Sequence, residues 1–154
     1  MIAVIQRVSS ASVSTEGKVI SSISQGILIL LGVEKGDTVE EAKWLADKIT
    51  DLRIFNDSEQ KMNLSIEEIK GEILVVSQFT IPAKIKKGRR PSFDYAEKPE
   101  IAEKLYEAFC SFIEMRNIPV KKGVFGAMMD VTLTNTGPVT FIVEKKSDGA
   151  WVHK

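Results

Sequence analysis

Apolar and polar residues alternate through much of the first third of the chain, and a period of two residues indicates β-strands. We expect strands at residues 2–8, 11–15, 19–23 and 27–33. The last of them, I-L-I-L-L-G-V, is apolar without interruption, which predicts a strand that is buried on both faces.

Two later segments repeat their apolar residues at helical spacing. Thr38 and Glu41 have the spacing of a capping box and predict the start of a helix. The apolar positions of that helix are Val39, Ala42, Leu45, Ala46, Ile49 and Leu52. Pro99 suits the first position of a second helix, which we expect to extend to about Asn117. Its predicted buried stripe is Ile101, Leu105, Ala108, Phe112 and Met115.

The rest of the chain predicts further strands and one irregular loop. Short apolar runs indicate strands at 53–55 and 72–79, and residues 80–98 are expected to be irregular because they contain two prolines and a glycine. Residues 127–134 and 139–145 are expected to form two antiparallel strands, with apolar faces at Val131/Leu133 and Val139/Phe141/Val143.

Composition places these elements in one globular unit. The chain has 154 residues, 44% of them hydrophobic and 27% charged, so we expect a single mixed α/β domain over residues 1–154, with helices packed against a sheet. No apolar run approaches the roughly 20 residues that cross a bilayer. The start of the chain lacks the pattern of a secretory signal, and Cys110 is the only cysteine, so we expect a cytoplasmic protein without an internal disulfide.

Charge is balanced overall but uneven along the chain. The 21 basic and 21 acidic residues give a formal net charge of zero, so the chain as a whole does not attract polyanions. One loop is nevertheless strongly basic, with Lys84, Lys86, Lys87, Arg89 and Arg90. Such a loop can bind phosphates at one place or can simply be solvated, and its residues alone do not choose between the two.

Several common catalytic arrangements are missing from the sequence. A Ser-His-Asp hydrolase needs a histidine base, and the only histidine, His153, is the penultimate residue, where chains are usually frayed. Cys110 lies in the middle of a predicted helix without a neighbouring base, which is typical of a core thiol. We therefore predict neither a metal nor a cofactor.

Two stretches at strand ends remain as candidates for a site. S-Q-F-T at 77–80 closes an apolar strand, whose end can aim successive backbone N–H groups at an oxyanion. T-N-T-G-P-V-T-F at 134–141 contains a Gly-Pro step, which is typical of a hairpin turn. Because Gly137 has no side chain, the same step can let a ligand approach the main chain closely. Both interpretations of the Gly-Pro step stay open from the residues alone.

With these stretches the sequence closely resembles the D-aminoacyl-tRNA deacylases, over essentially its whole length. The family often has Asp where this chain has Thr136, a position that varies within its motif. The motifs that carry the resemblance are I-Q-R-V-x-x-A-S-V at 5–13, S-Q-F-T at 77–80, G-R-R-P-S-F at 88–93, F-G-A-M-M at 125–129 and N-T-G-P-V-T at 135–140.

The resemblance implies hydrolysis of the ester between a D-amino acid and the 3′-terminal adenosine of tRNA, as proofreading in translation. It implies a homodimer with active sites at the subunit interface, and three layers with helices on one side of two sheets. The catalytic pocket would be Ser77, Gln78, Phe79 and Thr80. Gly137 and Pro138, joined by a cis bond in the family, would enter the partner's site and screen chirality. Supporting residues would be Arg7, which would brace the Gly-Pro loop across the dimer, Met129 and Asn135, and tentative tRNA-binding residues would be Lys86, Lys87, Arg89 and Arg90.

A main-chain wall against the α-carbon of the substrate gives the Gly-Pro step a physical role. Hydrogen fits where the side chain of an L-residue would collide, and glycine, with hydrogen on both sides, should be hydrolysed too. For the ester cleavage itself, we prefer assistance by the vicinal 2′-hydroxyl of the adenosine to a Thr80 nucleophile, since the sequence offers Thr80 no base. The rival functions are non-catalytic RNA binding by the basic loop and a general esterase with Thr80 or Ser77 as nucleophile.

Overall fold

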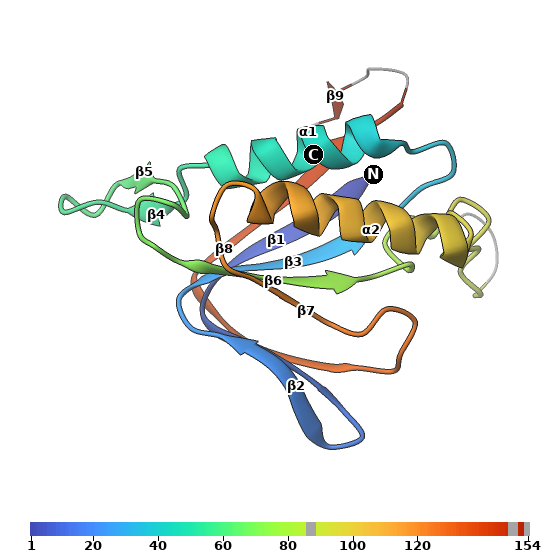
Figure 1. Ribbon diagram of the computed structural model, residues 1–154, viewed down its shortest axis with the longest axis horizontal. Coiled ribbons are helices and arrows are strands. Elements are labelled where there is room, and N and C mark those ends of the chain that lie inside the picture. The colour runs from blue at the N-terminus through green and yellow to red at the C-terminus, as the bar shows by residue number, and fades with distance from the viewer. Residues whose placement is uncertain (86–88, 148–150, 153–154) are drawn as a thin grey trace.

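Two helices lie across one face of a strongly bent β-sheet (Figure 1). The computed structural model describes residues 1–85, 89–147 and, by their backbone alone, 151–152. The helices of this described part are α1 (Val39–Asp51) and α2 (Pro99–Glu114). Its strands are β1 (Ile2–Thr15), β2 (Lys18–Ile23), β3 (Gly26–Gly32), β4 (Phe55–Asn56), β5 (Met62–Leu64), β6 (Glu72–Ser77), β7 (Val120–Lys122), β8 (Asp130–Lys145) and β9 (Trp151–Val152).

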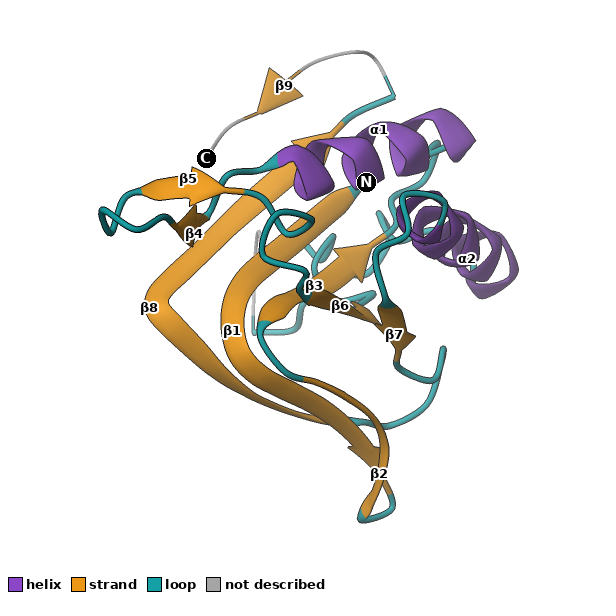
Figure 2. Cartoon of the chain, turned by 60° about the vertical axis from the view of Figure 1, so that its left-hand side comes forward, coloured by secondary structure: helices purple, strands orange, loops and turns teal. Residues whose placement is uncertain are grey.

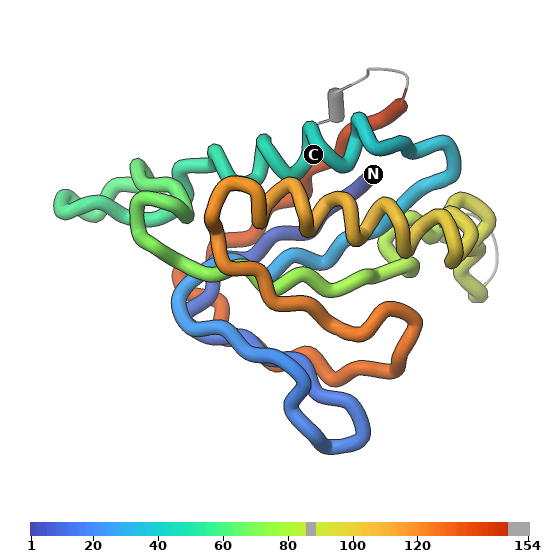
Figure 3. Tube along the Cα trace, in the orientation of Figure 1, coloured from blue at the N-terminus to red at the C-terminus, as the bar shows by residue number. Residues whose placement is uncertain are grey.

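Strand β1 organises the sheet, whose order is β7-β6-β3-β1-β8-β9. One edge of β1 pairs antiparallel with β3 and then with β2, and the other edge pairs antiparallel with β8. Strands β3, β6 and β7 are parallel neighbours. The first and last parts of the chain therefore run side by side (Figure 3). Strands β1 and β8 bend together, so that β2 and the far halves of both strands turn away from the helices (Figure 2).

The start of the chain forms one strand where we expected two. Residues 2–8 and 11–15 both belong to β1, which continues through the exposed Ser9 and Ser10. The continuity has a physical reason: β8 pairs with β1 on both sides of this polar step, from Ile2 to Ser14. A break in hydrophobic alternation therefore does not mark the end of β1.

The expected pair of antiparallel strands at 127–134 and 139–145 is wrong, and so is the hairpin turn between them. Both segments belong to the single strand β8, and both pair with β1. Gln6 lies opposite Thr140 and Val8 lies opposite Asn135, so residues 136–139 face Arg7 as a bulge. The residues that favour a turn have made a bulge, because β1 is long enough to pair with both halves of β8.

The segment between α1 and β6 also departs from expectation in detail. The strand predicted at 53–55 begins only at Phe55, and β4 pairs with β5, which the sequence analysis did not predict. These two strands form a small hairpin apart from the main sheet. The strand predicted at 72–79 ends at Ser77, so the last residues of S-Q-F-T lie in the turn that follows.

Helix α1 confirms its predicted start. The Thr38 hydroxyl accepts a hydrogen bond from the backbone of the first turn, and the Glu41 carboxylate accepts one from the Thr38 N–H at 2.8 Å. This reciprocal pair satisfies backbone donors that a helix start otherwise leaves free. Ala42, Leu45, Ala46 and Ile49 are buried as predicted, whereas Val39 is 52% exposed.

Helix α2 begins at Pro99 as predicted, but its buried stripe was assigned wrongly. Ile101 and Met115 are 45% and 74% exposed, and only Leu105 of the predicted stripe is buried. The residues that face the core are Ala102, Leu105, Tyr106, Phe109, Cys110 and Ile113. Apolar residues occupy most of the circumference of α2, so helical spacing allows two stripes, and the sheet selects the one containing Tyr106. The Tyr106 hydroxyl donates to the carbonyl of Val75 at 2.9 Å, beneath the helix.

Strands β3 and β6 are both buried on two faces, which confirms the prediction made for the continuous apolar run of β3. Ile27, Ile29 and Ile73 face the helices, in the larger core cluster. Leu28 and Leu74 face the other way, into a second cluster closed by the far half of β1 together with Val131 and Leu133 of β8. The predicted mixed α/β domain with two principal helices is thus confirmed, while the division into three layers stays a prediction. Within the described residues, neither helix is long and apolar enough to cross a membrane.

Candidate active site

Strand β6 delivers S-Q-F-T to the carboxyl edge of the parallel strands. Ser77 pairs with Leu31 of β3, and the Gln78 N–H donates to the Leu31 carbonyl at 2.8 Å. The chain then turns sharply, since the Ile81 N–H donates to the Gln78 carbonyl at 3.2 Å. The main chain on either side of Phe79 and Thr80 is therefore anchored, and these two residues lie exposed at the edge of the sheet.

The turn leaves two adjacent backbone donors free. Within the described residues, the N–H groups of Phe79 and Thr80 make no hydrogen bond. The Thr80 hydroxyl accepts a hydrogen bond from the side-chain amide of Gln78, and no described carboxylate contacts it. This geometry offers a pair of donors to an anion but offers Thr80 no base.

The loop after Thr80 packs closely against the end of strand β3, and this packing depends on Gly32. A β-carbon at Gly32 would lie 2.9 Å from the Cδ of Pro82 and 3.1 Å from the Cβ of Ile81. Glycine is thus required where the segment after Thr80 packs against the end of β3. The sequence analysis missed this role of Gly32, although a glycine inside an otherwise apolar strand is a signal for close backbone approach.

Gly137 and Pro138 are exposed at the bulge of β8, and the peptide bond between them is cis. Asn135 closes the bulge: its Oδ1 accepts from the Val139 N–H at 2.7 Å, and its Nδ2 donates to the Thr140 hydroxyl at 2.9 Å. The Asn135 amide thus replaces the strand pairing that the bulge interrupts. Hydrogen bonds between Asn135 on one side and Val139 and Thr140 on the other thus fix the exposed Gly-Pro step.

Arg7 stabilises the bulge by hydrogen bonds from the neighbouring strand β1. Its Nε donates to the carbonyl of Thr136 at 2.8 Å, and its Nη1 donates to the carbonyl of Ile54 at 2.7 Å and to Oδ1 of Asn56 at 3.1 Å. We expected Arg7 to support the Gly-Pro loop across a dimer, and the structure shows contacts to its own chain. Only the main-chain carbonyl of Thr136 is used, so this contact does not depend on the side chain at that position.

Gly137 has no room for a side chain. Its φ of +138° lies in the region that favours glycine, and a β-carbon there would lie 2.7 Å from Val139 Cγ2 and 2.9 Å from Arg7 Nη2. The Arg7 guanidinium therefore lies directly against the α-carbon of Gly137. Any larger residue has to displace either Arg7 or the bulge.

The structure does not bring the two candidate stretches together within one chain. Gly137 and Pro138 of β8 lie opposite Arg7 of β1. Arg7 pairs with Ile27 of β3, and Ile27 pairs with Ile73 of β6. Ser77 therefore lies across three strand spacings and four residue steps, roughly 14 Å across the sheet and 13 Å along it. Met129 lies nearer to β6, in the second core cluster with Val76, and its sulfur accepts from the Val124 N–H at 3.3 Å.

Comparison with known proteins decides which family this arrangement represents. Residues 4–144 match the model of the family described as D-Tyr-tRNA(Tyr) deacylase. The chain belongs to the D-Tyr-tRNA(Tyr) deacylase family. It is 57% identical over 144 residues to the D-aminoacyl-tRNA deacylase of Geobacter sp. strain M21, covering 94% of this chain and 97% of that protein. It is 58% identical over 144 residues to the D-aminoacyl-tRNA deacylase of Geotalea daltonii, covering 94% of this chain and 96% of that protein.

Two solved structures have a similar fold. The structure described as c-Myc DNA Unwinding Element Binding Protein has a TM-score of 0.90 and 41% identity, with coverage of 96% of this chain and 100% of that one. The structure of a probable eukaryotic D-amino acid tRNA deacylase has a TM-score of 0.75 over 92% of this chain and 97% of that one. At 19% identity, this second likeness shows that the fold is shared.

Three of the basic residues, Lys84, Arg89 and Arg90, lie in the described part of the loop that follows S-Q-F-T. Lys84 and Ser92 exchange backbone hydrogen bonds of 2.9 and 3.0 Å, and Arg89 and Arg90 are exposed. Phe93 packs against S-Q-F-T, with its ring centroid 5.2 Å from that of Phe79. The predicted Lys86 and Lys87 lie outside the described residues, as does His153.

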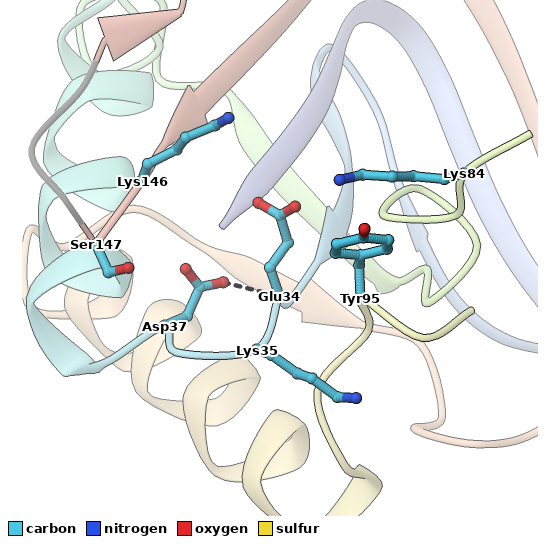
Figure 4. Close-up of a pocket in the computed structure, with 7 residues that line it drawn as sticks. All are labelled: Glu34, Lys35, Asp37, Lys84, Tyr95, Lys146 and Ser147. Atoms are coloured by element: carbon cyan, nitrogen blue, oxygen red, sulfur yellow. Dashed lines mark hydrogen bonds between the residues drawn. The ribbon is translucent and has the colours of Figure 1, made fainter. Parts of the chain in front are cut away.

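A polar recess contains Lys84 of the basic loop but none of the residues predicted for the catalytic pocket or the chirality screen. It is lined by Glu34, Lys35, Asp37, Lys84, Tyr95, Lys146 and Ser147 (Figure 4). Asp37 accepts from the buried α-ammonium of Met1 at 2.6 Å, and Lys84 lies over the Tyr95 ring. Burial raises the pKa of Asp37, while the Met1 ammonium opposes that rise. Much of the charge in this recess is thus paired, and we assign it to the anchoring of the chain start.

Cys110 is buried in the core, as predicted from its place in the helix. Burial raises the pKa of its thiol to about 12, so the thiol stays protonated and unreactive at neutral pH. Among the described residues, no group of three or more His, Cys, Asp or Glu side chains is arranged to hold a metal ion.

Proposed function

We propose that this protein hydrolyses the ester bond of D-aminoacyl-tRNA, and of glycyl-tRNA, while it rejects L-aminoacyl-tRNA. Membership of the deacylase family over residues 4–144 carries the proposal. The free N–H pair at Phe79 and Thr80 and the outward Gly137–Pro138 bulge support it, because they offer an anion site and a main-chain wall. The activity would serve proofreading in translation, in the cytoplasm.

The reaction we infer uses main-chain groups and the substrate itself. Attack on the ester carbonyl places a negative charge on its oxygen, which the N–H groups of Phe79 and Thr80 stabilise. The vicinal 2′-hydroxyl of the terminal adenosine helps to activate the attacking water. The Thr80 hydroxyl accepts from the Gln78 amide and has no base within the described residues, so we assign it the part of holding the turn rather than of attacking.

The chirality screen we infer is the main chain at Gly137 and Pro138. Asn135 and Arg7 hold this segment with side-chain hydrogen bonds on both sides, so it can act as a fixed wall. A wall close to the α-carbon of the substrate leaves room for hydrogen and excludes the side chain of an L-residue. Since the wall is made of main chain, it treats large and small D-residues alike.

The active protein is a homodimer in this proposal, with each site shared between two chains. The separation of Gly137–Pro138 from Ser77–Thr80 within one chain supports this arrangement, because the two stretches can face one another only across chains. One chain then contributes the donors, and its partner contributes the wall. The substrate is the aminoacylated 3′ end of tRNA.

The deciding experiment compares three esters at equal enzyme concentration: D-alanyl-, L-alanyl- and glycyl-tRNA. We expect rapid loss of the D-alanyl and glycyl esters and survival of the L-alanyl ester. If glycyl-tRNA survives as well as L-alanyl-tRNA does, the enzyme grips the D side chain and the rejection-only screen is wrong. If all three esters survive, the deacylase function itself is wrong.

Two other functions are tested by the same measurement. The name of one structural relative refers to DNA binding, and exposed Arg89 and Arg90 suit a nucleic-acid backbone, so tRNA binding without ester loss would favour a binding protein. A general esterase with Ser77 or Thr80 as nucleophile would instead cleave small activated esters and accumulate an acyl-enzyme.

A further inference from the structure

The β4–β5 hairpin contacts Arg7 on the side away from Gly137–Pro138. Arg7 Nη1 donates to the Ile54 carbonyl and to Oδ1 of Asn56, at 2.7 and 3.1 Å. We propose that Asn56 is a positioning residue for the chirality screen, acting through Arg7. The inference rests on the proposed function, in which Gly137 and Pro138 form the screen, and adds a residue that lies outside every motif of the site.

The guanidinium geometry explains how this contact reaches the screen. Guanidinium is planar with five N–H donors in a fixed fork, so contacts at two edges fix the orientation of the whole group. Nε is fixed by the Thr136 carbonyl, and both hydrogens of Nη1 are fixed by Ile54 and Asn56. Nη2 then lies where a β-carbon on Gly137 would be only 2.9 Å away. The plane of Arg7 therefore sets how far Gly137 can move inward.

Asn56 is the one side chain among the three acceptors that Arg7 uses within the described residues. The other two acceptors are main-chain carbonyls, which substitution does not remove. Asn56 itself is exposed and pairs through its backbone with Met62, so β4 and β5 stay paired when its side chain is shortened. Loss of the Asn56 amide should consequently loosen Arg7 while the hairpin and the stability of the fold are kept.

The test measures kcat/KM for D-alanyl-, L-alanyl- and glycyl-tRNA with four variants. Asn56→Ala and Asn56→Leu remove the acceptor, Asn56→Asp keeps an oxygen acceptor, and Ser58→Ala is a matched exposed change in the same hairpin. We expect the D-to-L ratio of kcat/KM to fall about three- to tenfold in the first two variants, as for one lost hydrogen bond of ordinary strength. Asn56→Asp and Ser58→Ala should keep the wild-type ratio, and Tm should change little in all four.

Glycyl-tRNA is the internal reference for this test. It has no side chain to collide with the wall, so its hydrolysis should be the same in wild type and in Asn56→Ala. An unchanged D-to-L ratio in Asn56→Ala and Asn56→Leu overturns the inference, and so does an equal loss in Ser58→Ala. A wild-type enzyme that does not distinguish D from L refutes the proposed function instead, so the two failures are distinguishable.

Discussion

Asn135 shows how single side chains serve a site that is made of main chain. Its amide bonds to Val139 and Thr140 across the Gly-Pro step, as Gln78 bonds to Thr80 beside the free N–H pair. In both places the polar side chain is used to fix a backbone conformation. The residues of the two motifs are thus best understood as supports, and the groups that would meet the substrate are carbonyls and N–H groups.

The role of Thr80 gives a prediction at this scale. Thr80→Ala removes the Gln78 contact and keeps the N–H of residue 80, so kcat should fall only about three- to tenfold, in line with one lost hydrogen bond. A substrate that ends in 2′-deoxyadenosine should be hydrolysed at least about 100-fold more slowly, in line with loss of general acid–base assistance. Single-turnover rates with wild type and variant measure both effects. An inactive Thr80→Ala with a normal deoxy substrate would restore the threonine nucleophile.

In the proposed function, the basic loop between Lys84 and Ser92 would link tRNA binding to the reaction. Lys84 and Ser92 are paired through their backbones, and Phe93 packs on Phe79, the residue that carries one of the free donors. Arg89 and Arg90 of this loop are exposed. An RNA backbone held there would approach the carboxyl edge of β6 from the same side as the reacting ester.

The positive charge of the 84–90 loop leads to a prediction about tRNA binding. Arg89→Gln with Arg90→Gln should weaken tRNA binding and flatten its salt dependence, because each lost phosphate contact lowers the slope of log K against log salt by about one. Binding titrations at several salt concentrations measure the slope. The control is Lys18→Gln with Lys104→Gln, an equal change of charge at two exposed positions on β2 and α2. An unchanged slope in the arginine variant would make 84–90 a solvated loop.

The bend of the whole sheet decides which surfaces can form one site. The helices cover one face, the far halves of β1 and β8 cover part of the other, and the carboxyl edge of β6 lies far from the β8 bulge (Figure 2). A single chain therefore displays half of the proposed site at each of two separate places. In the proposed homodimer, one complete site would therefore combine two copies of the fold.

Subunit complementation tests this at the scale of the whole molecule. Gly137→Ala should disturb the wall, because its β-carbon collides with Arg7 and Val139. Thr80→Pro should remove one oxyanion donor and lower activity about 100-fold or more. A heterodimer of the two variants contains one site with an intact wall and intact donors. Provided that Gly137→Ala is itself inactive, refolded mixtures should regain up to about a quarter of the wild-type rate with wild-type rejection of L-alanyl-tRNA, assuming random pairing of subunits. Recovery no better than the sum of the separate variants would place each site within one chain.

Local sequence determined the parts of this fold that depend on short-range physics. The capping box of α1 was predictable because neighbouring side chains satisfy the backbone donors of a helix start. The proline start of α2 was predictable because proline has no N–H to satisfy and its fixed φ suits the first helical position. The continuous apolar run of β3 predicted burial on both faces, since each face needs an apolar cover. The S-Q-F-T and Gly-Pro stretches were also predictable as candidates, because their motifs are local.

Tertiary structure alone decided the rest, because those features depend on partners distant in sequence. The same Asn-Thr-Gly-Pro residues suit a hairpin or a bulge, and only the pairing of both halves of β8 with β1 selects the bulge. The apolar surface of α2 suits two stripes, and only the sheet beneath Tyr106 selects one. The link from Asn56 through Arg7 to Gly137 joins three segments that no local pattern connects. Hydrophobic period and turn preference describe what a segment can do, and long-range packing decides which of those choices it makes.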